Sequence, residues 1–418
     1  MAYLGFGNRI IKFGNNILNS GETFFFKFSG ISFPEIRDEN NNAIIQLRFS
    51  TAEKITINYG NGVIIEYQSY FVSTGVYEII FRKKGGNTTS TNINTYNYPD
   101  NTLLSRVVSI NFDRQKLIYF NISSLKLEIG DFLFEITKYP ALKFFSIPQL
   151  TIVVGLNLEG SILTSQINEV IINSSFHNTS PYYTSVPDKL FQMPLKTLAI
   201  GSPGMSGGFA TTKFDQIYRL ATTLDYLKIE QTPITTLPSN FNLLTILKKL
   251  ELIATNHTVI PSEINSIPSI ENLFVGYNSF LTSWGNIANL VNLKSLQLIS
   301  TPNLSNVLPA YLNGFTLLKN VDRKGSLKTQ INVDAWVDNW YSFIVSNAAI
   351  SGINTLQFRG MTHNISQLTL TSDGTFAPSG IYQQPSGFVL GSSNGTPATP
   401  KEKIWVMVNQ YGHVWTTN

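Results

Sequence analysis

The sequence predicts a mainly β chain: a small β-sandwich, then an α/β solenoid of stacked strand-and-return repeats, then a small C-terminal β tip. Three observations predict this order. Short alternating apolar runs with a Gly-Asn-Gly turn fall in the first quarter of the 418 residues. An apolar phrase then recurs at a fixed spacing in the second half. Gly, Ser and Pro become dense near the end of the chain, ahead of further short β-type runs.

The composition excludes several classes of protein. Charged residues make up 13% of the chain and the net charge is +4, too little for the electrostatic footprint of a nucleic-acid binder. The absence of cysteine removes thiol nucleophiles, CxxC zinc sites, iron–sulfur clusters and disulfides. The first residues lack the basic and apolar regions of a secretory signal, and no apolar stretch is long enough to span a bilayer. We therefore expect no nucleic-acid partner and no membrane insertion.

The first 112 residues divide into two parts. Residues 1–20 mix Gly and Asn with Phe, Ile and Leu without a regular period, and we expect them to form an irregular attachment segment. Within residues 21–112, the alternating runs 55–59 and 63–67 flank the Gly-Asn-Gly turn, which predicts a hairpin. Residues 75–81 predict a further strand. We expect 21–112 to fold as an antiparallel β-sandwich of a size that can fold alone.

The residues of this hairpin carry a resemblance. Residues 56–62, read as Thr-Ile-Asn-Tyr-Gly-Asn-Gly, are followed by Tyr70 and by Gly-Val-Tyr-Glu-Ile at 75–79. This order resembles the signature of PKD-type (Ig-like) β-sandwiches, with Tyr59 in place of the family's Trp and Asn61 in place of its Asp. The resemblance implies a module that spaces and presents other domains.

The repeats begin with the phrase L-x-x-L-x-L at Leu224, Leu247, Ile270 and Leu293, and 247 − 224, 270 − 247 and 293 − 270 all equal 23. The return halves of these units repeat as well. The pattern is identified as that of leucine-rich repeats, which have periods of about 20–29 residues and a helical or 3-10 return. One repeat cannot bury its apolar positions alone, so neighbours must stack. Weaker copies extend the expected solenoid over 113–375 and lie at 142–147, 167–172, 195–200, 318–321 and 353–358.

Two features of the solenoid are expected to be structural. The polar position after each strand is Thr232, Thr255, Asn278 and Thr301, and we expect these side chains to hydrogen-bond the backbone where the chain leaves the strand. Near 332–346, Asn332 can cap a helix whose apolar residues share one face, and we expect this helix to close the open end of the solenoid. Those apolar residues are Val333, Trp336, Val337, Trp340 and Ile344.

The last segment, 376–418, is predicted to end in a β-hairpin formed by 403–409 and 413–415. The residues at 377–382, 395–405 and 410–413 resemble C-terminal segments of phage structural proteins from viruses that infect Bacteroidota-type hosts. In that family the segment follows a leucine-rich-repeat region. The resemblance implies a virion structural protein of the tail-fibre, spike or receptor-binding type.

No motif of an enzyme is found. His177, His257, His363 and His413 are scattered without metal-ligand spacing, and we expect each to lie at the surface or in a turn. The sequence contains no G-x-S-x-G elbow and no phosphate-binding loop, and the glycine-dense segment 201–208 lacks the lysine of such a loop. We therefore expect a protein that is not an enzyme, with no cofactor and no metal.

The repeats also predict two surfaces. The position after each first leucine alternates in charge until the last step, and we expect these side chains to form a solvated ladder that fixes the register of the strands. They are Lys196, Asp225, Lys248, Glu271, Lys294 and Lys319. The variable positions near mid-strand form a candidate ligand-contact surface on the concave side, suited to a glycan or a protein loop. Its residues are Tyr226, Lys228, Glu251, Phe274, Tyr277 and Gln297.

The expected function is host-cell attachment by an exposed appendage of the virion, synthesised in the host cytoplasm. Its N-terminal region would bind other virion proteins, its repeats would bind a host surface glycan or protein, and the resemblance to phage fibres allows a homotrimer. Two alternatives stay open. A bacterial surface or secreted leucine-rich-repeat adhesin would use the same modules, and a polysaccharide-degrading fibre enzyme would need two carboxylates facing each other across a cleft.

Overall fold

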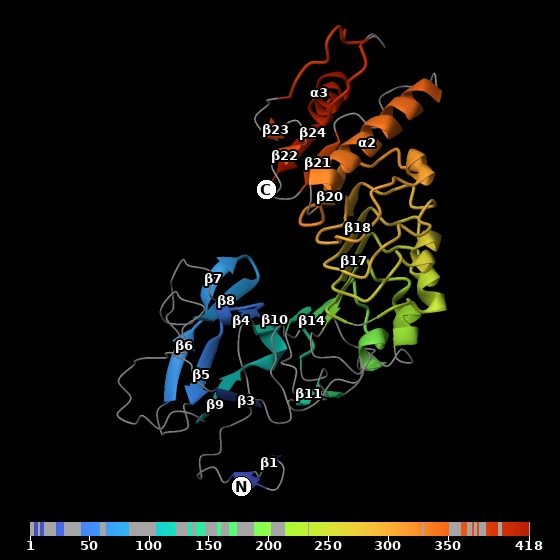
Figure 1. The fold of residues 1–418 in the computed structure, drawn as a ribbon. Helices are drawn as coiled ribbons and strands as arrows, with labels where there is room; N and C mark the ends of the chain where they lie inside the picture. Colours follow the sequence, from blue (N-terminus) through green and yellow to red (C-terminus); the bar gives the residue numbers. More distant parts are fainter. Residues whose placement is uncertain are drawn as a thin grey trace. The chain divides into compact units, whose positions relative to one another are not determined.

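The computed structural model places the chain in two compact units, Met1–Leu220 (unit 1) and Ala221–Asn418 (unit 2). Figure 1 shows the elements of both units. The residues that the structure describes are 4–6, 9–11, 22–28, 43–58, 64–82, 106–122, 133–135, 139–146, 157–159, 167–173, 188–201, 214–232, 234–327, 330–350, 361–365, 370–371, 374–375, 382–391 and 395–417.

Unit 1 contains two main sheets. The first is antiparallel and has the order β3-β9-β5-β6, with β3 Glu22–Phe28, β9 Arg106–Phe112, β5 Lys54–Asn58 and β6 Ile64–Gln68. The predicted hairpin is confirmed, because β5 and β6 pair from Lys54 with Gln68 to Asn58 with Ile64. The second sheet contains β7 Tyr70–Ser73, β8 Val76–Arg82, β4 Ala43–Phe49, β10 Leu117–Ile122, β12 Phe144–Ser146, β14 Glu169–Asn173 and β15 Thr197–Gly201.

The second sheet changes from antiparallel to parallel pairing at strand β10. This strand pairs antiparallel with β4 on one side and parallel with β12 on the other. Strands β12, β14 and β15 continue as a parallel ladder, which is the arrangement that stacked repeats produce. The hairpin-rich part and the first repeat-like strands therefore share one sheet in unit 1. Short pairs complete the described strands of this unit: β1 Leu4–Phe6 with β2 Arg9–Ile11, and β11 Leu133–Glu135 with β13 Asn157–Glu159.

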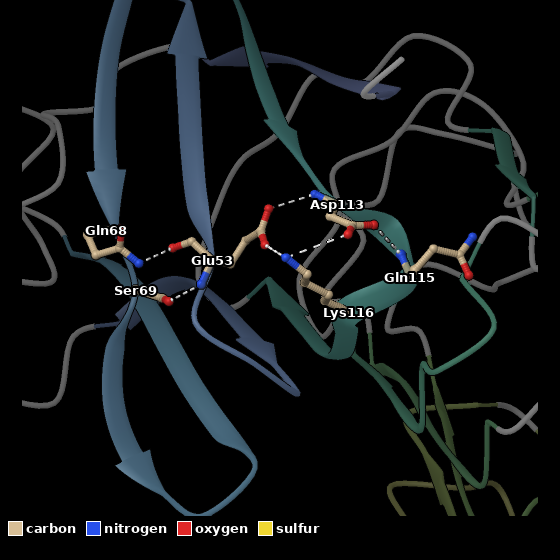
Figure 2. Close-up of polar contacts among 6 residues, drawn as sticks. All are labelled: Glu53, Gln68, Ser69, Asp113, Gln115 and Lys116. Carbon is tan, nitrogen blue, oxygen red and sulfur yellow. Dashed lines mark hydrogen bonds and ion pairs between the residues drawn. The ribbon is translucent and has the colours of Figure 1, made fainter. Parts of the chain in front are cut away.

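A buried carboxylate holds together described connections between these two sheets. Glu53, between β4 and β5, accepts hydrogen bonds from the Asp113 amide (2.9 Å to Oε1) and from Lys116 Nζ (2.9 Å to Oε2), as Figure 2 shows. Its backbone exchanges bonds with Ser69, whose Oγ accepts from the Glu53 amide at 2.7 Å. The hydrogen bond to Glu53 is the main reason that the pKa of Lys116 is raised. This buried group is fully paired, so its role is structural.

Unit 2 is a coil of stacked repeats, each with a strand and a return segment. Its parallel strands are stacked in chain order: β16 Tyr226–Glu230, β17 Lys249–Ile253, β18 Asn272–Gly276, β19 Ser295–Gln297, β20 Asn320–Arg323, β21 Thr362–Ile365 and β24 Val414–Thr417. The strands lie on one side of the coil and 3-10 turns on the other (Figure 1); the latter include η6 Ser239–Leu243, η7 Ser262–Ser266 and η8 Ala310–Gly314. Leu227, Leu250, Leu273 and Leu296 pair in register and are all buried. The repeat prediction is therefore confirmed.

The chain leaves successive strands through the same left-handed turn. Gln231, Ala254, Tyr277 and Ser300 have φ between 50° and 54°, an unfavourable region for residues with a side chain. Each is held by its amide, which donates to a carbonyl of the next repeat at 2.7–2.8 Å. The residue after each of these left-handed residues belongs to the predicted polar column. Thr232 and Thr301 donate to backbone carbonyls as expected, at 2.9 and 2.8 Å, whereas the Thr255 hydroxyl bonds the side chains of His257 and Asn278.

Helix α2, Gln330–Ile350, spans the region expected to be helical, and the five apolar residues of its predicted face are buried. The weak repeat copy at 353–358 lies outside the described residues. Beyond it, β21 pairs with β20 and with β24, so the parallel sheet continues past the helix. Among the described residues, no helix combines the length and the hydropathy needed to cross a bilayer.

The predicted C-terminal hairpin is wrong. Residues 400–411 form helix α3, Pro400–Tyr411, and only β24 is a strand. Thr399 and Glu402 form a capping box at the start of α3, Pro400 occupies its first turn, and Gly412 ends it with φ of 69°. Strand β24 then adds to β21 in parallel. In place of a separate β tip, the C-terminal segment supplies a helix and one more strand to the coil.

Candidate recognition surface

The outward side chains of β16–β20 form two rows, because alternate residues of a strand point to opposite sides of the sheet. We call these ten residues and Tyr277 the strand face. The first row is Tyr226, Lys249, Asn272, Ser295 and Asn320, and the second row is Lys228, Glu251, Phe274, Gln297 and Asp322. All of them except Tyr277 have intermediate exposure. The strands under them are fixed by the buried leucine column.

The structure places the six predicted contact residues on this face. Lys228, Glu251, Phe274 and Gln297 pair directly with one another along the second row. Tyr226 lies in the first row, and Tyr277 follows the end of β18. Sequence reasoning missed the rest of the first row. The signal for them was present, since they lie two residues before the second-row positions in the same strands.

The charges at the β16–β17 end of the face are paired within their own strands. Lys228 Nζ lies 2.7 Å from Glu230 Oε2, and Lys249 Nζ lies 2.7 Å from Glu251 Oε1. Lys249 Nζ also lies 4.1 Å from the centroid of the Tyr226 ring. Each predicted charged contact residue thus has an oppositely charged neighbour two positions away. This end of the face is electrostatically balanced.

The β18–β20 end of the face carries two aromatic rings, amide and hydroxyl side chains, and one carboxylate, that of Asp322. The rings of Phe274 and Tyr277 lie 6.4 Å apart, and Tyr277 is 56% exposed. A Cβ on Gly276 would lie 2.1 Å from Cε2 of Phe274, so a larger residue at this position would displace that ring. Asn320 Nδ2 donates to Ser295 Oγ at 2.9 Å. Aromatic rings beside amides and hydroxyls can contact both the apolar and the polar parts of a ligand.

The predicted charge ladder forms on the exposed border of the strands. Lys248 Nζ lies 3.6 Å from Asp225 Oδ1, and Lys294 Nζ lies 2.7 Å from Glu271 Oε2. The hydrogen bond from Lys294 lowers the pKa of Glu271. The backbone reinforces the same steps, since the amide of each ladder residue from Lys248 to Lys319 donates to the carbonyl of the previous one at 2.7–2.9 Å. The ladder therefore matches the strand register, and four of its six charges, those of Asp225, Lys248, Glu271 and Lys294, are paired without a ligand.

None of the three described histidines lies at the surface as expected, and His363 lies in strand β21 and not in a turn. His257, His363 and His413 are buried, and His177 lies outside the described residues. His363 occupies the leucine column between Val321 and Trp415, and its Nε2 lies 3.0 Å from Nδ1 of His413. Burial lowers the pKa of His257 to about 4, and burial together with His413 lowers that of His363. These histidines are part of the core.

Within the described part of the chain, no group of three or more His, Asp or Glu side chains could hold a metal ion. The two acidic residues of the strand face both have described partners: Glu251 forms an ion pair with Lys249, and Asp322 Oδ1 accepts a hydrogen bond from the Lys324 amide. The face has the characteristics of a rigid contact surface, with balanced charges at one end and exposed rings at the other.

No protein-family model matches the chain, and no curated protein matches it. Several solved structures are similar to parts of it. Three of them are the functional domain of InlJ from Listeria monocytogenes (16% identity, 62% of this chain and 47% of that chain, TM-score 0.35), the internalin InlF from Listeria monocytogenes (14%, 56% and 65%, 0.32) and a leucine-rich-repeat protein from Leptospira interrogans (16%, 55% and 62%, 0.28). This chain covers less than two thirds of each of those chains.

Proposed function

We propose that the chain is a non-enzymatic recognition protein of a virion, a tail-fibre or spike component that binds the host surface through its strand face. The observation that carries the proposal is the pair Phe274 and Tyr277, two rings 6.4 Å apart on the sheet, with Phe274 between Glu251 and Gln297 in the second row. A binding surface needs rings and hydrogen-bonding groups that are ordered before the ligand arrives, because ordering them on binding costs affinity.

The assignment to a virion rests on the resemblance of the C-terminal segment to phage structural proteins. In this proposal the N-terminal region binds other virion proteins, three copies assemble into one appendage, and the ligand is a host surface glycan or protein. A chain without cysteine suits this role, because it folds in a reducing cytoplasm and keeps its covalent structure outside the cell. Localisation on purified particles separates this proposal from the adhesin alternative, which predicts the chain on the bacterial surface.

Replacing Tyr226, Phe274 and Tyr277 together by Ala is expected to weaken binding of the labelled full chain to host cells at least about tenfold, since aromatic side chains dominate the energy of many interfaces. The measurement is cell-bound fluorescence against protein concentration. The melting temperature should stay near that of the wild type, because none of the three side chains lies in the buried leucine column.

The matched control replaces Phe71 and Tyr218 by Ala, two exposed aromatic residues of unit 1. It should bind host cells like the wild type. Equal binding by the triple variant and the wild type would remove the strand face as the contact site. Release of reducing ends from host polysaccharide by the wild-type chain would contradict the non-enzymatic proposal.

A further inference from the structure

An arginine occupies an apolar position of the unit 2 core. Ile229, Leu252 and Val275 pair in register as the third apolar column of the repeats. In β20 the second column is Val321, which pairs with Leu296, so two residues later Arg323 takes the place of the third leucine. Its side chain is 1% exposed. A guanidinium therefore lies where every earlier repeat of this unit has an aliphatic side chain.

The described protein leaves this guanidinium largely without hydrogen-bond acceptors. Its Nη2 lies 3.4 Å from the carbonyl oxygen of Leu304, at the long limit for a hydrogen bond. No described acceptor lies within hydrogen-bond distance of Nε or Nη1, and no described carboxylate forms an ion pair with the group. One face is covered by the Trp336 ring of α2, with Cζ 4.7 Å from the ring centroid. Burial lowers the pKa of Arg323 to about 9, so the group is still charged at neutral pH.

A second unsatisfied donor belongs to a ring that contacts Trp336. Trp340 follows Trp336 by one helical turn, their rings lie 5.9 Å apart, and both are buried. The indole Nε1 of Trp340 also has no acceptor among the described residues. The three unsatisfied atoms of Arg323 and Trp340 are all N–H donors. A buried group of donors with one net positive charge is stabilised by an acceptor that carries one negative charge.

We propose that Arg323 and Trp340 bind a small monovalent inorganic anion, with chloride as the representative, in the core beneath α2. The single guanidinium balances one negative charge. A spherical ion also accepts from the guanidinium and indole N–H groups without demanding a fixed geometry. The anion joins β20 to α2 and so ties the helix to the last regular repeat. This site is separate from the strand face, because Arg323 points into the core and Asp322 points away from it.

The test compares melting temperatures of the full chain in sodium chloride and in sodium gluconate at equal ionic strength, since gluconate is too large for such a site. The wild type should melt higher in chloride, with a rise of about 3–5 °C for each tenfold increase above the dissociation constant. Arg323→Met should abolish the difference between the two salts, and Trp340→Phe should reduce it. The matched control Lys324→Met, which removes the neighbouring positive charge, should keep it.

The readout is the difference between salts, because Arg323→Met can raise the melting temperature in both by replacing a buried charge with an apolar side chain. An equal melting temperature of the wild type in chloride and gluconate would overturn the proposal, and so would an undiminished chloride response in Arg323→Met. Bromide-soaked crystals add a direct measurement. An anomalous peak between Arg323 and Trp340 is expected, whereas peaks at the surface alone, from an adventitious ion only, would contradict it.

Discussion

Leu250→Ala is expected to lower the free energy of unfolding of the chain by about 2–5 kcal/mol. Leu250 is fully buried and lies in register between Leu227 and Leu273, so its removal leaves a cavity between two stacked repeats. Each repeat is stabilised mainly by its neighbours, and a weakened junction therefore affects both sides. The measurement is urea-induced unfolding followed by circular dichroism.

The control for this change is Leu243→Ala. It removes the same atoms from η6, where Leu243 is 48% exposed, and should cost less than about 1 kcal/mol, as for most surface substitutions. Similar losses for the two variants would mean that the strands of unit 2 are not stacked in the described register.

Acid is expected to destabilise unit 2 through its buried histidines. The pKa of His257 falls from an ordinary 6.5 to about 4 because burial disfavours the charged ring. The unfolded chain therefore binds a proton at a higher pH than the folded chain does. The free energy of unfolding is therefore unaffected by His257 above pH 6.5. It decreases as the pH falls from 6.5 towards about 4, and His257 causes no further change below that value. At about 1.4 kcal/mol for each pH unit, the loss amounts to about 3 kcal/mol.

His363 acts in the same direction, because burial and the neighbouring His413 lower its pKa as well. The measurement is the free energy of unfolding at pH 7, 5.5 and 4.5 for the wild type, His257→Gln and His363→Gln. The wild type should lose more stability than either variant over this range. Carboxylate effects are common to all three proteins, so parallel curves would show that neither histidine is buried in its neutral form.

The sequence predicts most of the repeat architecture because the phrase recurs without insertions from Leu224 to Leu298. A constant spacing fixes which side chains point inward, and the charged pairs and the polar column then follow from register alone. The same argument predicts that the six contact residues lie on one face. It does not predict the ion pairs of Lys228 and Glu251, each of which joins two residues that are two positions apart in one strand.

The regular spacing ends where α2 is inserted. Val321, His363 and Trp415 pair as neighbours in one buried column, yet a helix or a long loop separates each from the next in sequence. No local pattern assigns a lone histidine to a leucine column across such a gap. The burial of Arg323 could not be predicted for a related reason. A charged residue at an apolar position breaks the L-x-x-L-x-L pattern by which the repeats are recognised.

Helix α3 could have been predicted. Thr399, Pro400 and Glu402 form a Thr-Pro-x-Glu start, which satisfies both the capping box and the preference for proline in the first turn. The alternation around Trp405 was instead interpreted as a strand. In the helix, Ile404, Met407 and Tyr411 are buried at spacings of three and four, the period of a helix face.

Hydroxyl-radical footprinting of the full chain, with and without host cell envelopes, tests the central claim most directly. It measures the oxidation rate of each exposed aromatic side chain. Recognition through the strand face predicts slower oxidation of Tyr277, which is 56% exposed, while Phe71 and Tyr218 of unit 1 react as in the free chain. Protection confined to Phe71 and Tyr218, or no protection of Tyr277 at saturating envelope, would contradict the claim.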